Sequence, residues 1–379
     1  MPGSSAPSPA RRASLRRRLL AWWDAGHRDL PWRFPQRAAD PYRVWIAEVM
    51  LQQTRVETAI PFYRRFVARW PTLDALAEAG DDEVLAAWSG LGYYARCRNL
   101  LAAARQARAR HGGLPSSLEA LRSLPGFGPY TAGAVASIAF AIPAAAVDGN
   151  VARVLSRLLL VGGDPKSLKV KRGLEGLAGV LVDRLRPGDF NQALMELGAM
   201  TCLPRKPDCA NCPLAASCGA FRAGRQADFP RSRARRRPSR VLLAVLRVER
   251  GGRLLLSRAP DGGLLGGMWG LPGIEVPRGV DPAGALLEWG RREIGARMEV
   301  GREIASVVRV LTHRRLEFRV FRGRLGAGRR PVRDPLRFTT EGEASSLPAS
   351  TAMRRVIEAS GGWVFAPPGP RDTKNVARE

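Results

Sequence analysis

The first half of the chain carries apolar residues at helical spacing almost throughout. From Leu15 to about Cys218, hydrophobic positions recur three and four residues apart, and breakers such as Gly112-Gly113 and Pro187-Gly188 separate the runs. The run at 43–54 is apolar around most of its circumference, which is typical of a buried helix. The other predicted helices are Pro61–Trp70, Asp81–Trp88, Cys97–His111, Leu118–Arg122, Thr131–Phe140, Val151–Leu160, Gly173–Arg186 and Phe190–Met200. This pattern predicts an all-α domain.

Beyond residue 240 the pattern changes to the alternation of strands. The predicted strands are Val241–Val248, Arg253–Ser257, Ser306–Leu311 and Glu317–Phe321, and the predicted helices are Pro282–Ile294 and Thr351–Ala359. We therefore expect a multidomain protein of α and α+β class. Its predicted parts are a disordered tail at 1–14, an all-α domain at 15–223, a basic linker at 224–240, an α+β domain at 241–365 and a disordered tail at 366–379.

The charge of the chain points to a polyanionic partner. Lys and Arg number 61 against 34 Asp and Glu, which gives a net charge of +27. Because 56 of the 61 basic residues are arginine and Ala and Gly are abundant, the composition of a GC-rich genome is an alternative source of this charge. The basic run 231–238 is likewise either a solvated connector or a segment that follows a DNA backbone.

Neither a secretory signal nor a membrane span is evident in the sequence. The apolar run after the N-terminal tail is too short and too charged for a secretory signal, and no later stretch approaches the length of a membrane span. We expect a soluble, monomeric protein of the bacterial cytoplasm, associated with the nucleoid and with no membrane partner.

One short region combines a loop suited to phosphate with a nearby carboxylate. In Leu124-Pro-Gly-Phe-Gly-Pro-Tyr-Thr-Ala-Gly-Ala134, the glycines at 126 and 128 permit positive φ and a close backbone approach just before a helix. Such a loop directs free backbone N–H groups toward a ligand, and a phosphate fits there. Asp148 then immediately precedes the next helix. Together these features suggest chemistry performed on a nucleic acid.

Four of the five cysteines crowd into one segment. Cys202, Cys209, Cys212 and Cys218 have the spacing C-x6-C-x2-C-x5-C, and without a secretory signal this crowding favours a metal site over disulfides. Four thiolates suit either a cubane iron–sulfur cluster or structural zinc, and the spacing alone leaves both open. Cys97 lies outside the group and is interpreted as a buried thiol.

Taken together, these motifs resemble the endonuclease III superfamily of helix-hairpin-helix base-excision glycosylases. Within it, the segments 45–54 (Trp-Ile-Ala-Glu-Val-Met-Leu-Gln-Gln-Thr), 91–96 (Leu-Gly-Tyr-Tyr-Ala-Arg), 31–33 and 190–193 resemble the MutY-type adenine DNA glycosylases. The resemblance implies that Cys202, Cys209, Cys212 and Cys218 hold a [4Fe–4S] cluster. It also implies a double-stranded DNA partner that contains adenine opposite 8-oxoguanine or guanine.

Tyr130 decides between two reactions within the superfamily. Bifunctional members carry a lysine at this position, whose amine forms the Schiff base needed for strand cleavage, and a phenol cannot form an imine. We therefore expect base removal without strand cleavage.

Base removal needs a proton donor and a negative charge under the sugar. Glu48 lies in an apolar helix where burial raises the pKa of a carboxyl group, and the resemblance places the catalytic acid there. Asp148 lies at a helix start, where the helix dipole and free N–H groups favour the ionised form. The resemblance implies that it stabilises the sugar cation, either by electrostatics or by a transient covalent bond. By resemblance, Asn150 and Tyr130 assist these carboxylates.

The resemblance also implies the DNA contacts. Extrusion of the adenine is assigned to Gln53 and Tyr93 as intercalating residues, with Thr54 and Leu91 near the orphaned base. The adenine pocket is assigned to Trp32, Arg33 and Gln192, and the phosphate contact to Gly126 and Gly128 with a monovalent cation in the hairpin.

The C-terminal region resembles a Nudix domain that has lost its catalytic carboxylates. Segment 262–273 carries the resemblance, but Trp289 and Arg292 occupy two of the three glutamate positions of the Nudix motif and only Glu293 remains. We therefore expect recognition of 8-oxoguanine, through Thr312 and His313, and no pyrophosphate hydrolysis. A bifunctional lyase, a non-catalytic damage-binding protein and a Nudix hydrolase are the alternatives to an adenine glycosylase of base excision repair.

Overall fold

The chain is divided between two compact units. The computed structural model describes residues 6–34, 39–231, 238–260, 265–294, 298–310, 314–326 and 335–363. One unit comprises Met1–Glu78 and Asn99–Ala234, and the other comprises Ala79–Arg98 and Arg235–Glu379. The second unit thus includes residues 79–98, which the sequence reading assigned to the helical domain. Within the described ranges, no helix is long and apolar enough to cross a membrane.

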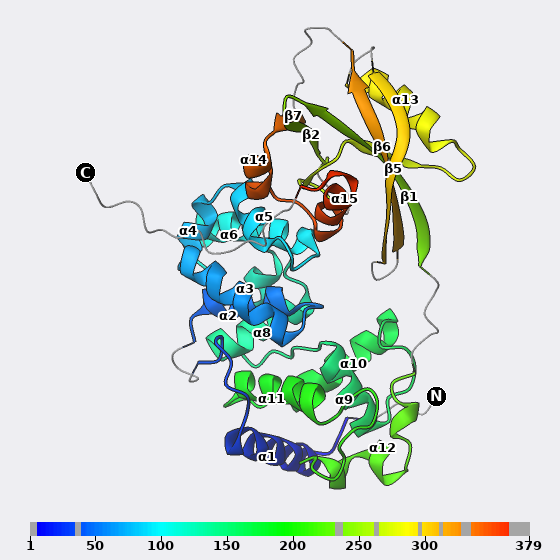
Figure 1. Ribbon diagram of the computed structural model, residues 1–379. Coiled ribbons are helices and arrows are strands. Elements are labelled where there is room, and N and C mark those ends of the chain that lie inside the picture. Colours follow the sequence, from blue (N-terminus) through cyan, green and yellow to red (C-terminus); the bar gives the residue numbers. More distant parts are fainter. Residues whose placement is uncertain are drawn as a thin grey trace. The chain divides into compact units, whose positions relative to one another are not determined.

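Helices alone build the first unit (Figure 1). They are α1 (Pro9–Ala25), α2 (Pro41–Leu51), α3 (Val56–Arg69), α4 (Leu73–Glu78), most of α6 (Tyr94–His111), α7 (Leu118–Arg122), α8 (Pro129–Phe140), α9 (Gly149–Leu159), α10 (Leu168–Leu181), α11 (Pro187–Met200) and α12 (Gly219–Arg222), with 3₁₀ turns at Ala215–Ser217 and Gln226–Asp228. Several begin with a side-chain cap or with proline in the first turn, which satisfies or removes N–H groups that have no partner inside the helix.

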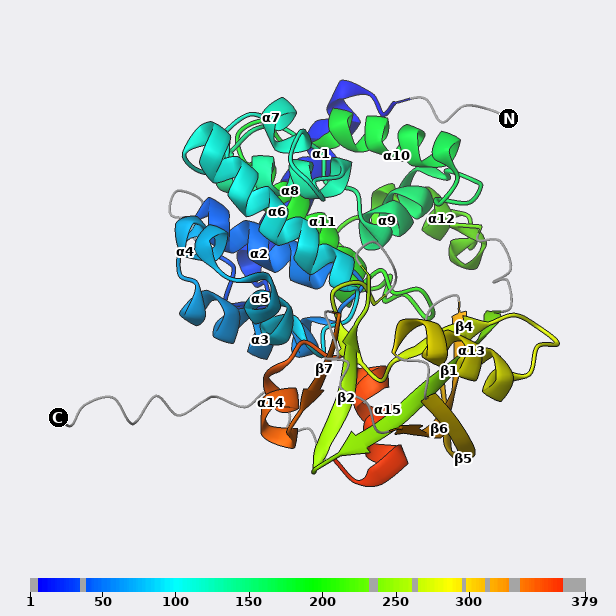
Figure 2. The ribbon, with the colours of Figure 1, turned by 90° about the horizontal axis from the view of Figure 1, so that it is seen from above.

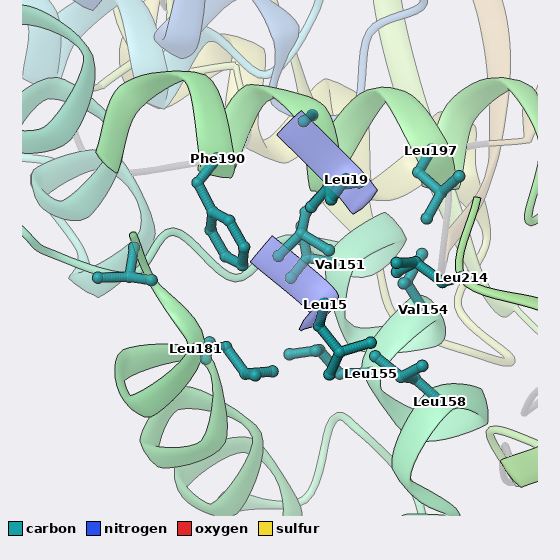
Figure 3. Packing of buried hydrophobic residues seen from close by; sticks show 14 of the residues in the cluster. Leu15, Leu19, Val151, Val154, Leu155, Leu158, Leu181, Phe190, Leu197 and Leu214 are labelled. Atoms are coloured by element: carbon teal, nitrogen blue, oxygen red, sulfur yellow. The ribbon is translucent and has the colours of Figure 1, made fainter. Parts of the chain in front are cut away.

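Packing of four helices forms one core of this unit. Figure 3 shows leucines of α1, the apolar face of α9, and residues of α10 and α11 pointing toward one another. Val151 and Leu155 of α9 are fully buried between Leu15 and Leu19 of α1 and Phe190 of α11. This core holds the start of α9, and therefore Asp148, against α11.

Several helices of this unit differ from the sequence prediction, among them α1, α3 and α10. The predicted disordered tail is wrong for residues 9–14, because Ser8 caps α1 and the helix begins at Pro9. Helix α3 begins at Val56 and contains Pro61 in its interior, since the burial of Tyr63 and Phe66 outweighs the hydrogen bond that proline removes. Helix α10 begins after the Ser167 cap and ends at Leu181 instead of Arg186.

A mixed sheet forms the centre of the second unit (Figure 2). Its strands are β1 (Ser239–Arg250), β2 (Arg253–Arg258), β3 (Trp269–Gly270), β4 (Gly273–Val276), β5 (Met298–Val310), β6 (Arg314–Leu325) and β7 (Leu336–Thr339). The order is β3-β2-β1-β6-β5, with β4 paired to β1 and β7 to β2, and β1 and β6 are parallel. The helices are α5 (Asp81–Trp88), α13 (Pro282–Glu293), α14 (Glu341–Ser346) and α15 (Thr351–Gly361).

Both faces of this sheet are covered by helices, as the alternation along β1 requires. Ala244, Leu246 and Val248 belong to a core that includes Leu286 of α13. Val245 belongs to the opposite core, together with α14 and α15. Because successive side chains of a strand point to opposite faces, one strand contributes to both cores. The predicted fold class, an all-α domain followed by an α+β domain, is confirmed.

We predict that Gly133→Ala destabilises the first unit. A Cβ at this position of α8 would lie 2.0 Å from the backbone oxygen of Ala145, and backbone cannot move aside as a flexible side chain can. The expected loss in the free energy of unfolding is about 3 kcal/mol, measured by denaturant titration. The control is Gly176→Ala in α10, where a Cβ meets nothing within 4 Å; it should stabilise by about 0.5–1 kcal/mol. Equal effects of the two substitutions would contradict the steric explanation.

Candidate active site

Glu48 is buried in the middle of α2. The Asp40 carboxylate caps this helix by accepting the Tyr42 N–H at 2.9 Å, and Pro41 occupies its first turn. Its neighbours Ala47 and Val49 are buried as well, and Glu48 itself is 6 % exposed. A carboxyl group in such an apolar helix loses its hydration, which favours the neutral form.

Tyr130 reaches Glu48 from the start of α8. Its phenol Oη donates to Glu48 Oε2 at 2.6 Å and lies 3.6 Å from the Met195 sulfur on α11. Burial raises the pKa of Glu48 to about 7; the Tyr130 hydrogen bond lowers it, the Asp148 charge raises it and the Arg33 charge lowers it. Glu48 therefore exchanges its proton near neutral pH, as a general acid or base must.

Tyr130 itself stays neutral. Burial raises the pKa of its phenol well above the usual value, and the nearby carboxyl groups of Glu48 and Asp148 raise it further. The phenol is therefore a hydrogen-bond donor at the acid.

Asp148 caps α9. Its Oδ1 accepts the Val151 N–H at 2.7 Å and its Oδ2 accepts Asn150 Nδ2 at 3.1 Å. The N–H groups at the helix start lower the pKa of Asp148, as expected, but burial outweighs them and the Arg153 charge, so the pKa is raised and the ionised form is not favoured as predicted. A cationic sugar nearby would favour the ionised form again, since opposite charges attract more strongly away from water.

Asn150 is held in place from two sides. Arg153 Nη2 donates to Asn150 Oδ1 at 2.9 Å and to the Gly198 carbonyl at 2.7 Å, and Arg153 Nε donates to the Cys202 carbonyl. A Cβ on Gly198 would lie 2.7 Å from the Cβ of Asn150, so α11 approaches α9 closely here. The sequence reading missed Arg153, although its place three residues after Asn150 on one helix face was a usable signal.

The hairpin glycines differ from each other. Gly126 has φ +76°, whereas Gly128 has φ −72° and is the N-cap of α8. Of the two glycines that were expected to permit a positive φ, only Gly126 therefore adopts one. The Gly128 N–H donates to the Gly126 carbonyl at 3.1 Å, so it is engaged within the loop, and no side chain caps the start of α8.

The predicted adenine pocket residues come from the turn that follows α1 and from α11. Trp32 is buried and meets Tyr63 edge-on, with ring centroids 5.3 Å apart. Arg33 stacks on Trp23 at 4.7 Å and donates to Glu196 Oε2 at 2.8 Å. Gln192 is half-buried on α11.

Glu196 was missed by the sequence reading. It is an acidic residue among the apolar residues Leu194, Met195 and Leu197 of α11, which is the same kind of signal that singled out Glu48.

After α2, the chain turns at the first predicted intercalating segment. Gln53 is exposed with φ +59°, a left-handed conformation that costs a non-glycine residue about 1–2 kcal/mol. The preceding Gln52 donates from Nε2 to the Thr131 hydroxyl at 3.0 Å, and Thr54 contacts the Gln52 carbonyl. Backbone held in such a conformation is common at functional sites.

The second such segment, before α6, lies in the other unit. Tyr93 is 43 % exposed with φ +52°, and the Arg96 guanidinium lies 5.3 Å from its ring centroid. Leu91, by contrast, is buried. An exposed aromatic ring on a constrained turn suits insertion into a base stack.

The four clustered cysteines are free thiols that influence one another. Burial raises the pKa of Cys212 to about 11, and the charges of the three other clustered cysteines, Cys202, Cys218 and Cys209, raise it further. Arg157 Nη1 donates to Cys202 Sγ at 3.4 Å and Gln226 Nε2 to Cys209 Sγ at 3.8 Å. In the described part of the chain, no three His, Cys, Asp or Glu side chains come close enough to hold a metal ion.

The Nudix-like region keeps a cavity of about 780 Å³. Trp289, Arg292 and Glu293 line it, and Glu293 is the one acidic side chain among its described lining residues. Magnesium sites use several carboxylate oxygens. Thr312 and His313, predicted to read 8-oxoguanine, lie outside the described residues.

Comparison with known proteins gives two family matches. Residues 46–178 match the HhH-GPD superfamily of base excision DNA repair proteins, and residues 243–359 match the NUDIX domain. An adenine DNA glycosylase of Mus musculus is 38 % identical over 91 % of this chain and 77 % of its own length. One of Homo sapiens is 38 % identical over 91 % of this chain and 73 % of its own.

Among solved structures, a thermostable thymine-DNA glycosylase is similar, with 29 % identity, a TM-score of 0.49, and coverage of 56 % of this chain and 98 % of that one. With the mouse and human relatives matched over most of their length, the chain belongs to the adenine DNA glycosylase family.

Proposed function

We propose that this protein hydrolyses the N-glycosidic bond of adenine paired with 8-oxoguanine or guanine in duplex DNA, and leaves the DNA strand intact. The observation that carries the proposal is the Tyr130 hydrogen bond to the buried Glu48. It unites an acid that titrates near neutral pH with a phenol in the place where a strand-cleaving relative has an amine.

In the proposed reaction, Glu48 is the general acid. Tyr130 occupies Oε2, which leaves Oε1 to carry the proton toward adenine N7. As the proton arrives, the bond between C1′ and N9 breaks, and its electron pair leaves with the neutral base. Water then adds to C1′ and returns a proton to the Glu48 carboxylate, so the acid is regenerated.

Asp148 is proposed to stabilise the cationic sugar between these steps. The burial that raises its pKa also strengthens its attraction for a positive charge placed beside it. Asn150, fixed by Arg153, orients the Asp148 oxygen that it contacts. Catalysis by this pair needs no covalent chemistry from a lysine.

The substrate contacts are proposed from the resemblance and, for Gln53 and Tyr93, also from the exposure of their side chains. Gln53 and Tyr93 enter the base stack, with Thr54 and Leu91 beside the orphaned base. Trp32, Arg33 and Gln192 receive the adenine. The hairpin of Gly126 and Gly128 binds a phosphate, with a monovalent cation, and Thr312 and His313 read the 8-oxoguanine. The proposed partner is duplex DNA, bound by a monomer in the bacterial cytoplasm without a membrane partner.

We also propose that Cys202, Cys209, Cys212 and Cys218 hold a [4Fe–4S] cluster. The spacing of the four cysteines supports this proposal, and N–H donors reach two of the sulfurs, those of Cys202 and Cys209, as they do around iron–sulfur ligands. The cluster would tie the loop at 202–218 together.

The reaction is tested by single-turnover assays on duplexes with adenine opposite 8-oxoguanine, with thymine glycol, and with undamaged pairs. We expect adenine release that yields strand breaks only after alkali. Glu48→Gln and Asp148→Asn should each lower the rate by about a thousandfold while duplex binding survives, because the first removes the proton donor and the second removes the negative charge that stabilises the cationic sugar. Near-normal turnover in either variant rejects that assignment, and alkali-independent nicking favours a lyase.

The pH dependence follows from the pKa of Glu48. Because the acid acts when protonated, the rate should fall as the pH rises through about 7. Tyr130→Phe removes a hydrogen bond that lowers this pKa, so its alkaline limb should move to higher pH. Tyr42→Phe is the matched control, since it deletes another hydroxyl near the start of α2, whose bond runs to the Trp70 carbonyl. If the alkaline limb of Tyr130→Phe stays at the pH of the wild-type protein, the assignment of Glu48 as the general acid is contradicted.

The cluster is tested by metal content and colour. The purified protein should contain about four iron atoms per chain and absorb at roughly 400 nm. Cys212→Ser should lower both values, whereas Cys97→Ala should leave them unchanged, because Cys97 lies outside the clustered segment and contacts the Val84 carbonyl. A colourless protein that contains zinc would overturn the iron–sulfur proposal.

A further inference from the structure

Glu196 is a buried acid that binds two arginines at once. It is 3 % exposed on α11. Arg28 donates from Nε to its Oε1 at 2.8 Å and from Nη2 to its Oε2 at 2.6 Å, and Arg33 Nη2 donates to Oε2 at 2.8 Å. The Arg28 backbone N–H reaches the same carboxylate at 3.2 Å. One carboxylate thus anchors both ends of the segment that carries Trp32.

The Glu196 carboxylate stays ionised near neutral pH. Burial alone would raise the pKa of Glu196, but the hydrogen bonds and charges of Arg28 and Arg33 outweigh it and lower the pKa to about 2. Two guanidinium charges therefore share one fixed carboxylate. The Arg33 side chain is 11 % exposed, so water screens its charge little.

Arg33 links the Glu196 carboxylate to the Glu48 carboxyl group. Beyond Glu196 it donates from Nη1 to the Arg28 carbonyl at 2.7 Å and lies over the Trp23 ring. Its positive charge acts on Glu48, which also faces Tyr130 from α8 and Asp148 from the start of α9. Whatever offsets the charge of Arg33 therefore bears on the protonation of Glu48.

We propose that Glu196 is a positioning residue for base removal, which holds Arg33 at the base pocket and offsets the guanidinium charge that acts on Glu48. The inference rests on the proposed function of Glu48 as the acid. Glu196 does not touch the reacting atoms; it acts through Arg33.

A purely architectural ion pair would give a different result. If Glu196 only fixed the segment 26–34 against α11, its loss would lower the rate by the same factor at every pH. If it offsets the charge of Arg33, its loss changes the pH at which Glu48 loses its proton. The position of the alkaline limb is therefore the measurement that separates the two roles.

The test is the single-turnover rate of adenine release by the full chain, measured from pH 5 to pH 9 for Glu196→Gln. The substitution keeps the size of the side chain and removes its charge, so the uncompensated guanidinium lowers the pKa of Glu48. The alkaline limb should move down by about one pH unit, which makes the variant about tenfold slower at alkaline pH beyond any uniform loss. A limb that does not move overturns the proposal.

A double-mutant cycle shows whether the effect runs through Arg33. In Arg33→Gln the limb should move to higher pH, and in the Arg33→Gln background Glu196→Gln should add no further downward shift. This double variant also keeps the proposal testable if Glu196→Gln alone does not fold, because it leaves one guanidinium without the Glu196 carboxylate, that of Arg28, where Glu196→Gln leaves two. If the alkaline limb of the double variant lies at a lower pH than that of Arg33→Gln, the proposal is overturned.

The matched control is Asp189→Asn on the same helix. Asp189 accepts from Arg186 Nε at 2.8 Å, and Arg186 keeps Asp24 as a second partner. This variant loses one carboxylate of an ion pair on α11 and should leave the limb in place. A shift equal to that of Glu196→Gln would mean that any lost charge on the helix suffices.

Failure of the proposed function has a separate signature. If the wild-type chain releases no adenine, the glycosylase proposal fails. The pKa of Glu48 is then read from the carboxyl carbon by NMR on protein labelled with ¹³C-glutamate, with the signal assigned by Glu48→Gln. A lower Glu48 pKa in Glu196→Gln still supports the charge coupling, and an unchanged pKa overturns it.

Discussion

A carboxyl group that must hold a proton near neutral pH needs to lie away from water, and the helical unit is built around that requirement. Glu48 lies among buried residues of α2, and its oxygen receives the Tyr130 hydroxyl at 2.6 Å. The contact needs α8 to lie close to α2 and α8 itself to be fixed at Gly133, where a side chain would strike the backbone at Ala145. The chemistry therefore depends on close backbone packing as much as on the acid.

Burial is not the only influence on the pKa of Glu48. The Tyr130 hydrogen bond and the Arg33 charge lower its pKa, while Asp148 raises it, so the value reflects opposing influences. In a site that excludes water each of these charges acts strongly. An arginine near such an acid therefore needs its own partner, and Glu196 supplies a permanent one.

The two carboxylates of the proposed reaction are held by different means. Glu48 lies in the middle of a helix, where its position follows from side-chain packing. Asp148 lies at a helix start, where Val151, Asn150 and, through Asn150, Arg153 fix its oxygens. The first arrangement favours the neutral form and the second retains hydrogen bonds for the charged form, although burial moves both pKa values upward. This division suits one group that donates a proton and another that stabilises a cation.

In the second unit, the pattern at Val241–Val248 was enough to predict the strand β1, but short strands such as Trp269–Gly270 were missed. Two residues carry too little periodicity to be recognised before their partners are known. The start of α1 was missed for a related reason, since its arginine-rich first turns carry no apolar pattern.

The sequence by itself determined the fold class and the family, and it singled out Glu48, Tyr130 and Asp148 as candidate site residues, because these depend on local motifs and on residue type. It also showed that Tyr130 cannot form an imine, which is a property of the side chain alone. Only the tertiary structure decided the direction of the Asp148 pKa and the partnership of Glu196 with Arg28 and Arg33. Desolvation and ion pairing depend on which segments meet in space. Glu196 lies 163 residues from Arg33 along the chain, and folding makes them neighbours.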